Sequence, residues 1–143
     1  MSDATLKAIV YVSASALPMT SEMLEKLLLD ARALNRESGV TGVLLYIDGT
    51  FMQYFEGAPQ AMEETYERIH RSRLHSRLKE MMNESIIHRA FPDWQMGLAR
   101  PSRSELLALS TASWIVQDSQ SRALGVRSVG MALLHDFWSR RPH

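Results

Sequence analysis

Two strand-like segments joined by a two-residue turn dominate the middle of the sequence. Residues 40–47 (VTGVLLYI) and 50–57 (TFMQYFEG) are rich in β-branched and aromatic residues, and the pair Asp48-Gly49 stands between them. An Asp-Gly pair flanked by such segments is the strongest short-range signal for a β-hairpin. The sequence therefore predicts two antiparallel strands, and the rest of the chain has to fold around them.

Segments on either side of the hairpin complete an alternating order of strands and helices. Apolar residues recur at helical spacing over residues 20–38, where Thr20 or Ser21 is the expected N-cap and Gly39 ends the helix. The other predicted elements are a strand over 6–13, a helix over 61–75, a strand over 79–89 and a short fifth strand over 94–99. The order β-α-β-β-α-β predicts an α+β, ferredoxin-like fold, in which the first and third strands are central neighbours and both helices cover one face.

Beyond Pro101 the pattern changes to two further helices, predicted over 104–116 and roughly over 121–140. The second of these carries an apolar stripe, formed by Val126, Val129, Leu133 and Phe137. We expect both helices to pack on the face of the sheet that the first two helices leave open. Residues 101–143 are thus predicted to be a helical extension of the domain formed by residues 1–100.

Length and composition restrict the classes of protein that the chain fits. Its 143 residues suit one domain with a core, and 45% hydrophobic with 22% charged residues is typical of a globular protein. The sequence shows no signal peptide and no apolar run of the roughly 20 residues that span a bilayer, so we expect a cytoplasmic protein. The absence of cysteine excludes thiol redox chemistry. Sixteen basic residues balance sixteen acidic ones, so neither nucleic acid nor a membrane is an expected partner.

One strand of the hairpin places an amide on an apolar face. The turn puts Leu44 opposite Gln53, and Gln53 shares its face with Phe51 and Phe55. A buried amide without partners costs roughly 1–3 kcal/mol, so a polar group should lie near Gln53. Tyr11 on the neighbouring first strand is the expected partner. A core hydrogen bond with no ligand explains this pair as well as a binding site does.

Four segments of the sequence, taken in order, resemble the BLUF (blue light using flavin) family. They are Ile9–Ser13 (IVYVS), Asn35 followed by Gly39–Gly42 (GVTG), Gly49–Gly57 (GTFMQYFEG) and Arg89–Met96 (RAFPDWQM). The resemblance covers about two thirds of the chain, and the segments fall on the elements predicted above.

This resemblance implies a bound flavin. An oxidised flavin, usually FAD, would lie between the two helices with its ring against the central strands, lined by Gln53 and Tyr11. Asn35 would hold the pyrimidine edge, where an amide matches a carbonyl and an N–H together, although an asparagine there also suits the end of a helix. The other residues implied to bind the flavin are Ser13, Leu27, Phe51, Ile69, Arg73, His75 and Met96.

The mechanism implied by the resemblance is a light reaction without turnover. Blue light excites the flavin, Tyr11 gives it an electron and a proton through Gln53, and the radical pair recombines. Gln53 is left rotated or tautomerised, and the absorption shifts slightly to the red. Trp94 and Met96 stand at the position where the family passes the signal on, although simple packing also explains Trp94.

Two positions depart from the family pattern. Leu34 stands where relatives often carry a polar or aromatic ring contact, and Leu74 replaces an arginine that often helps to hold the flavin phosphates. Arg73 or Arg71 is a candidate replacement for that arginine. FMN and riboflavin therefore remain alternatives to FAD.

The resemblance also implies how the protein works in a cell. We expect a photoreceptor and not an enzyme, which forms a homo-oligomer and signals to a downstream protein through the C-terminal helices or the fifth strand. The residues expected on that surface are Leu106, Leu109, Trp114, Phe137 and Trp138. Two alternatives remain, namely a flavin-free interaction module with the same fold and a small flavin-dependent redox enzyme.

Overall fold

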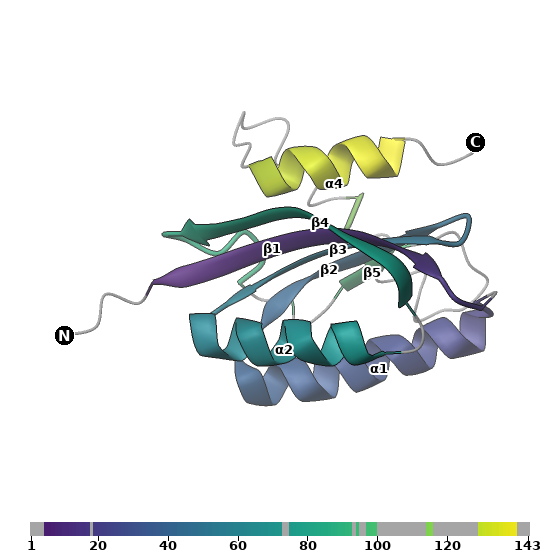
Figure 1. Cartoon of the computed structure of the whole chain (residues 1–143), viewed down its shortest axis with the longest axis horizontal. Coiled ribbons are helices and arrows are strands. Elements are labelled where there is room, and N and C mark those ends of the chain that lie inside the picture. The colour runs from purple at the N-terminus through teal and green to yellow at the C-terminus, as the bar shows by residue number, and fades with distance from the viewer. Residues whose placement is uncertain are drawn as a thin grey trace.

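A five-stranded sheet lies between two helices on one face and a third helix on the other (Figure 1). The computed structural model describes residues 5–17, 19–72, 75–92, 94, 97–99, 114–115 and 129–139. The strands are β1 (Leu6–Ser15), β2 (Thr41–Ile47), β3 (Thr50–Gly57), β4 (His75–Ile86) and β5 (Gly97–Ala99). The helices are α1 (Ser21–Ser38), α2 (Pro59–Arg71) and α4 (Val129–Ser139).

The order of strands across the sheet is β4-β1-β3-β2-β5. Strands β4, β1, β3 and β2 are antiparallel to their neighbours, whereas β5 pairs parallel with β2. The first and third strands are thus neighbours near the centre, and α1 and α2 cover the same face (Figure 1). This is the α+β, ferredoxin-like arrangement that the sequence predicts. Strand β5 occupies three residues of the range 94–99 that was predicted as a strand.

The hairpin has the predicted register. Asp48 and Gly49 form the turn with φ angles of 47° and 80°, the left-handed conformations that such a turn requires. Tyr46 lies opposite Phe51, and Leu44 lies opposite Gln53. The turn chemistry therefore fixes which β3 side chains face the helices.

Helix α1 begins and ends where the sequence predicts. The hydroxyl of Thr20 accepts a hydrogen bond from the backbone N–H of Met23 at 3.1 Å, which caps the first turn. Gly39 adopts a left-handed φ of 74° after the last turn, and its N–H donates to the carbonyl of Asn35 at 2.9 Å.

The boundary between α2 and β4 differs from the prediction. Helix α2 ends at Arg71, and the chain is already in β4 at His75, which pairs with Ser15. Both predicted boundaries were therefore wrong by four residues. The helix was predicted to reach residue 75, and the strand was predicted to begin at residue 79. Pairing with β1 also sets the other end of β4, because Ile86 is opposite Leu6, where β1 begins. Long-range pairing overrides the local pattern at both ends.

Two irregularities mark β4, which forms one edge of the sheet. Its pairing with β1 shifts register between Val10 and Tyr11 and again between Val12 and Ala14. Arg77, within the second irregular stretch, has a φ of 51°. The strand is therefore bulged and locally bent.

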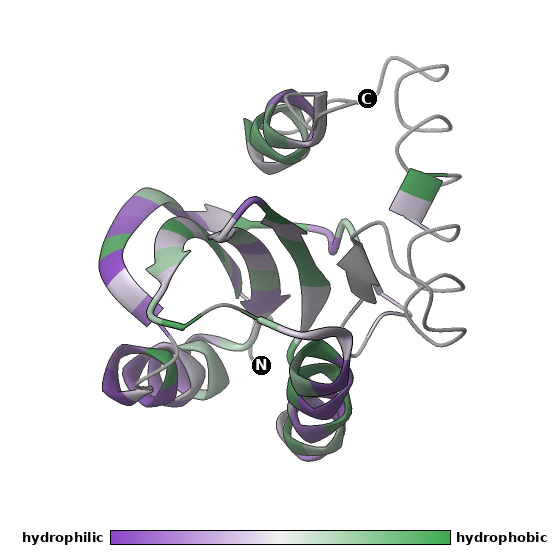
Figure 2. Cartoon of the chain, turned by 90° about the vertical axis from the view of Figure 1, so that its right-hand side faces the viewer, coloured by the Kyte–Doolittle hydropathy of each residue, from purple (hydrophilic) through white to green (hydrophobic). Residues whose placement is uncertain are grey.

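The two faces of the sheet pack against different layers, as Figure 2 shows end-on. The face toward α1 and α2 buries the residues Ile9, Tyr11, Leu44, Phe51 and Phe55. The opposite face buries Val10, Val43, Leu45, Met52 and Tyr54 against α4 and Trp114. The side chains of β1 thus alternate between the two faces of the sheet.

The predicted apolar stripe of helix α4 is confirmed only in part. Leu133 and Phe137 are partly buried against the core, whereas Val129 is 57% exposed and Val126 lies outside the described residues. The residues that the helix buries are Gly130, Met131, Leu134 and Trp138. A Cβ atom on Gly130 would lie 2.3 Å from the Tyr54 ring, so the helix backbone rests directly on that ring. The other predicted C-terminal helix (104–116) lies outside the described residues except for Trp114 and Ile115. Trp114 and Trp138 are buried in the core, so the expectation that they lie on a partner-binding surface was wrong. Among the described residues, no helix is both long and apolar enough to cross a membrane.

Candidate ligand-binding pocket

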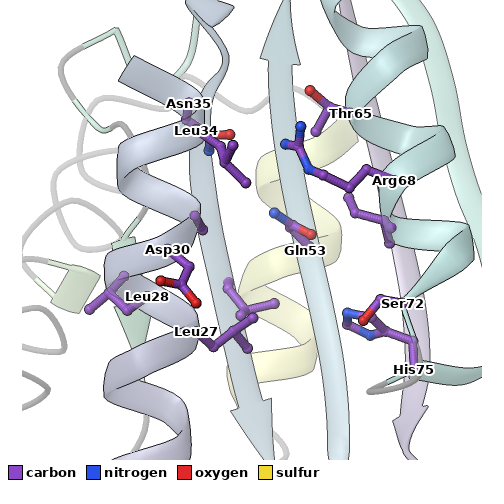
Figure 3. A pocket seen from close by; sticks show the side chains of 13 residues that line it. Leu27, Leu28, Asp30, Leu34, Asn35, Gln53, Thr65, Arg68, Ser72 and His75 are labelled. Carbon is purple, nitrogen blue, oxygen red and sulfur yellow. The ribbon is translucent and has the colours of Figure 1, made fainter. Parts of the chain in front are cut away.

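A pocket of about 170 Å³ opens between α1 and α2, above the central strands (Figure 3). Its walls are largely apolar, and a few polar groups reach into it, which is the usual character of a small-molecule site. Helix α1 contributes Leu27, Leu28, Asp30, Ala31, Leu34 and Asn35; the strands contribute Leu44 and Gln53; and the side of α2 and β4 contributes Thr65, Arg68, Ile69, Ser72 and His75.

The amide of Gln53 lies at the floor of the pocket and is bonded to Tyr11. The two residues are direct partners in the β1–β3 register, and the Tyr11 O–H donates to Gln53 Oε1. This bond turns the amide oxygen toward β1, and Figure 3 shows the nitrogen on the side of α1. Gln53 is 7% exposed and Tyr11 fully buried. The predicted contact between the side chains of Tyr11 and Gln53 is therefore confirmed.

Burial controls the protonation of Tyr11. Removal from water is the main cause that raises the pKa of its phenol far above the usual value, and the nearby Tyr66 raises it further. The phenol therefore stays protonated at any ordinary pH. It can release its proton only to the group that it already faces, which is Gln53 Oε1.

Asn35 serves the end of α1 and the wall of the pocket at the same time. Its backbone carbonyl accepts from the Gly39 N–H at 2.9 Å and from Ser38 Oγ at 3.4 Å. Its side chain is 2% exposed and lines the pocket (Figure 3). The helix-ending role thus belongs to the backbone, and the side chain belongs to the pocket wall.

His75 closes one end of the pocket. Its Nδ1 lies 2.7 Å from Ser13 Oγ, and its ring centroid is 5.8 Å from that of Tyr11 and 5.0 Å from that of Phe51. Burial lowers the pKa of His75 to about 4, so the imidazole is neutral at neutral pH.

This shifted pKa has a consequence for stability. The folded pKa of His75 is about 4 and the usual value is near 6.5, so between these pH values the unfolded chain binds a proton that the folded chain does not. Stability is therefore lost as pH falls through this window. We expect His75→Asn to remove on the order of 1–2 kcal/mol of that pH dependence. Urea unfolding at pH 7 and pH 4.5 measures it.

His88→Asn is the matched control, because His88 is exposed. It should leave the pH dependence of the unfolding free energy as it is in the unmodified chain. An unchanged pH dependence in His75→Asn would contradict the assignment of a neutral, buried imidazole.

The structure sorts the residues that the sequence analysis linked to a ligand into three groups. Five line the pocket: Leu27, Asn35, Gln53, Ile69 and His75. Three lie directly behind it, each against a lining side chain: Tyr11 against Gln53, and Ser13 and Phe51 against His75. Arg73 and Met96 lie outside the described residues.

Trp94 packs away from the pocket. Its ring lies 5.3 Å from that of Phe91, at the border of the core cluster under α4. Its backbone carbonyl accepts a hydrogen bond from the Gly42 N–H at 2.8 Å, which ties it to β2.

Sequence reasoning missed several polar residues of the pocket, of which Arg68 is the most notable. Arg68 carries a guanidinium on the α2 wall, near Thr65 (Figure 3). The spacing of Thr65 and Arg68 along α2 is that of one helix face, and this face also carries the predicted Ile69. A search for polar as well as apolar residues at helical spacing would have identified Arg68 from the sequence.

Comparisons with known proteins agree with this geometry. Residues 6–97 match the sequence model of the BLUF family, described as sensors of blue-light using FAD. The photoactivated adenylate cyclase subunit beta of Euglena longa is 32% identical over 95 residues, which is 66% of this chain and 11% of that protein. The chain thus spans about a tenth of that relative.

Two solved structures extend the likeness to three dimensions. The dark-state structure of BlrB, a BLUF protein, has a TM-score of 0.64 at 30% identity and covers 80% of this chain and 86% of that one. Klebsiella pneumoniae BlrP1 with FMN and cyclic diGMP has a TM-score of 0.61 at 27% identity and covers 65% of this chain and 25% of that one.

Proposed function

Because the chain belongs to the BLUF family of flavin-binding blue-light sensors, we propose that the pocket between α1 and α2 is its flavin site and that Tyr11 and Gln53 are its photoactive pair. The observation that carries this proposal is the buried hydrogen bond from the Tyr11 hydroxyl to an amide on the pocket floor. A tyrosine and a glutamine in this relation give the site a donor and a proton acceptor in direct contact.

The side chains of the pocket fit a flavin ring. Leucine and isoleucine side chains from both helices suit the flat apolar faces of the ring, as Leu27 and Ile69 illustrate. The amide of Asn35 and the guanidinium of Arg68 suit carbonyl and ring-nitrogen atoms along a polar edge. The family description names FAD, and the BlrP1 structure holds FMN, so FAD is the proposed cofactor, with FMN and riboflavin as alternatives.

The flavin, when bound, supplies the absorption of blue light and an electron acceptor in the excited state. Tyr11 gives up an electron, and because burial keeps its phenol protonated, the proton leaves along the existing bond to Gln53 Oε1. Return of the electron and proton to Tyr11 leaves the amide rotated or tautomerised. The Gln53 amide then makes different hydrogen bonds with the groups around it than it made in darkness, and this change is the signal.

The signal is proposed to leave the site through the segment that carries Trp94 and Met96. Trp94 is tied to β2 and packs toward the α4 layer, which is the direction the signal would take. We propose that the chain acts as a sensor and not as an enzyme, forms a homo-oligomer, and passes the signal to a partner protein through its C-terminal helices or β5. The division into residues 1–100 and an extension 101–143 stays a prediction.

The absorption spectrum of the purified protein, in darkness and immediately after blue light, tests the proposal. We expect a flavin spectrum that shifts slightly to longer wavelength and reverts in darkness. A bound flavin that bleaches with NADH and shows no shift would instead support a redox enzyme. A folded protein that stays colourless after incubation with FAD, FMN and riboflavin would support the flavin-free interaction module.

A further inference from the structure

A carboxylate is buried at the end of β3, on the face opposite the pocket. Glu56 has no exposed surface. Its Oε1 accepts from the Tyr54 hydroxyl and from the backbone N–H of Ala90, both at 2.8 Å. Its Oε2 accepts from the backbone N–H of Phe91 at 2.6 Å and from the Thr41 hydroxyl at 3.3 Å. A buried carboxylate is tolerated only with such partners, so this group is held in one geometry.

Two of these four bonds fasten the segment between β4 and β5 to the sheet. Arg89, at the start of the segment, donates to Thr41 Oγ1 at 2.8 Å and to the carbonyl of Glu56 at 3.3 Å. At the end of the segment, the Trp94 carbonyl accepts from β2 at 2.8 Å. Residues 89–94, described except for residue 93, are thus attached to the sheet at both ends and by the carboxylate between them.

The same segment is packed as well as hydrogen-bonded. The Phe91 ring lies 5.3 Å from the Tyr54 ring on the sheet and 5.3 Å from the Trp94 ring. Phe91 is 1% exposed. Its backbone N–H, which donates to the carboxylate, and its ring therefore fix Trp94 against the α4 face of the sheet.

Glu56 also lies on the strand that carries Gln53. The two residues are three apart on β3, so their side chains point to opposite faces of the sheet. Leu44 of β2 pairs with Gln53 on one side and with Leu98 of β5 on the other, so β2 alone separates the amide from β5. The Glu56 carboxylate provides a second connection between Gln53 and this part of the chain. It runs along β3 and then, on the face of the sheet opposite the pocket, to the segment 89–94.

We propose that Glu56 is a positioning residue that makes the segment 89–94 follow β3, so that a change at Gln53 reaches Trp94. This inference rests on the proposed function of the pocket. A rigid carboxylate with two backbone N–H partners moves the segment together with the strand. Without the carboxylate, β3 and the segment would be joined, among the residues that the structure describes, only by packing and by the contacts of Arg89.

The test is the response of Trp94 to light in Glu56→Gln. The amide replaces one acceptor oxygen by an N–H₂ group, which faces donors and breaks the bonds on that side. Protein labelled with 5-fluorotryptophan has three indoles, and Trp94→Phe assigns the resonance of Trp94. We expect Glu56→Gln to retain the flavin red shift but to reduce the light-induced shift of the Trp94 resonance at least about threefold, because the N–H₂ group faces one of the two backbone N–H donors of the segment and breaks that connecting bond.

Tyr54→Phe is the matched control. It removes one hydrogen bond to the same carboxylate but leaves both backbone N–H groups of the segment bonded to it. A residue that served stability alone would give both variants the same Trp94 response, so equal responses would overturn the proposal. If Glu56→Gln does not fold, Glu56→Asp keeps the negative charge but shortens the side chain by one CH₂ group, which draws the carboxylate away from the backbone N–H groups of Ala90 and Phe91; an undiminished Trp94 response there would also overturn the proposal.

The failure of this inference is distinguishable from failure of the proposed function. If the unmodified protein shows no flavin red shift, the proposed photoreceptor is wrong. If it shows the red shift and Glu56→Gln keeps the full Trp94 response, the pocket assignment stands and only the role of Glu56 is wrong.

Discussion

Replacing Tyr11 by phenylalanine is expected to leave flavin bound and to abolish the reversible red shift. The change removes only the hydroxyl that donates to Gln53 Oε1, whereas the ring and its contacts with Phe55 and Tyr66 survive. Without the phenol, position 11 can give up neither the electron nor the proton, so the hydrogen bond of Gln53 does not change. The amplitude of the light-minus-dark difference spectrum should fall at least about tenfold, a loss typical of removing a proton-transfer group.

Tyr66→Phe provides the control for this experiment. The Tyr66 ring stacks at 6.2 Å from the Tyr11 ring, so the variant removes a neighbouring hydroxyl and keeps the Tyr11–Gln53 bond. Its difference spectrum should be close to that of the unmodified protein. A normal red-shifted state in Tyr11→Phe would overturn the role assigned to the phenol.

Replacing Asn35 by leucine is expected to weaken flavin binding strongly. The side chain is nearly the same size and fully within the pocket wall, so the change removes polar atoms without opening a cavity. A ligand edge that faces leucine instead of an amide loses its partners while buried, which costs roughly 1–3 kcal/mol, or up to about a hundredfold in Kd. Flavin fluorescence quenching during titration of the flavin-depleted protein measures the affinity.

The control for Asn35→Leu is Glu37→Leu. Glu37 is exposed on the same helix and does not line the pocket, so the flavin affinity should not change. Helix α1 ends through the backbone carbonyl of Asn35, which both variants keep, so a comparison of unfolding midpoints checks that each remains folded. Equal flavin affinity in the two variants would show that the pyrimidine edge is held elsewhere.

Much of the fold could be predicted because its strongest signals are local. Asp48-Gly49 sets the hairpin register, and that register alone puts Gln53 on the face toward the helices. The alternation along β1 then places Tyr11 on the same face. Turn chemistry and the two-residue period of a strand act over a few residues, so a single sequence reveals them.

The features that escaped prediction depend on contacts between distant segments. The start of β4 at His75 is set by pairing with Ser15, and the inward face of α4 is set by the close approach of Gly130 to Tyr54. The four partners of Glu56 come from three separate parts of the chain. No periodicity in the sequence reports such meetings, because they depend on how the elements are assembled.

The irregular edge of the sheet bears on how copies of the chain can assemble. A regular, apolar edge strand invites another strand to pair with it. Strand β4 is twice interrupted in register and exposes charged side chains along its length, namely Arg77, Lys79, Glu80 and Glu84. We therefore expect any oligomer of this protein to leave β4 unpaired, so that this edge of the described sheet stays in solvent and self-association depends on another surface.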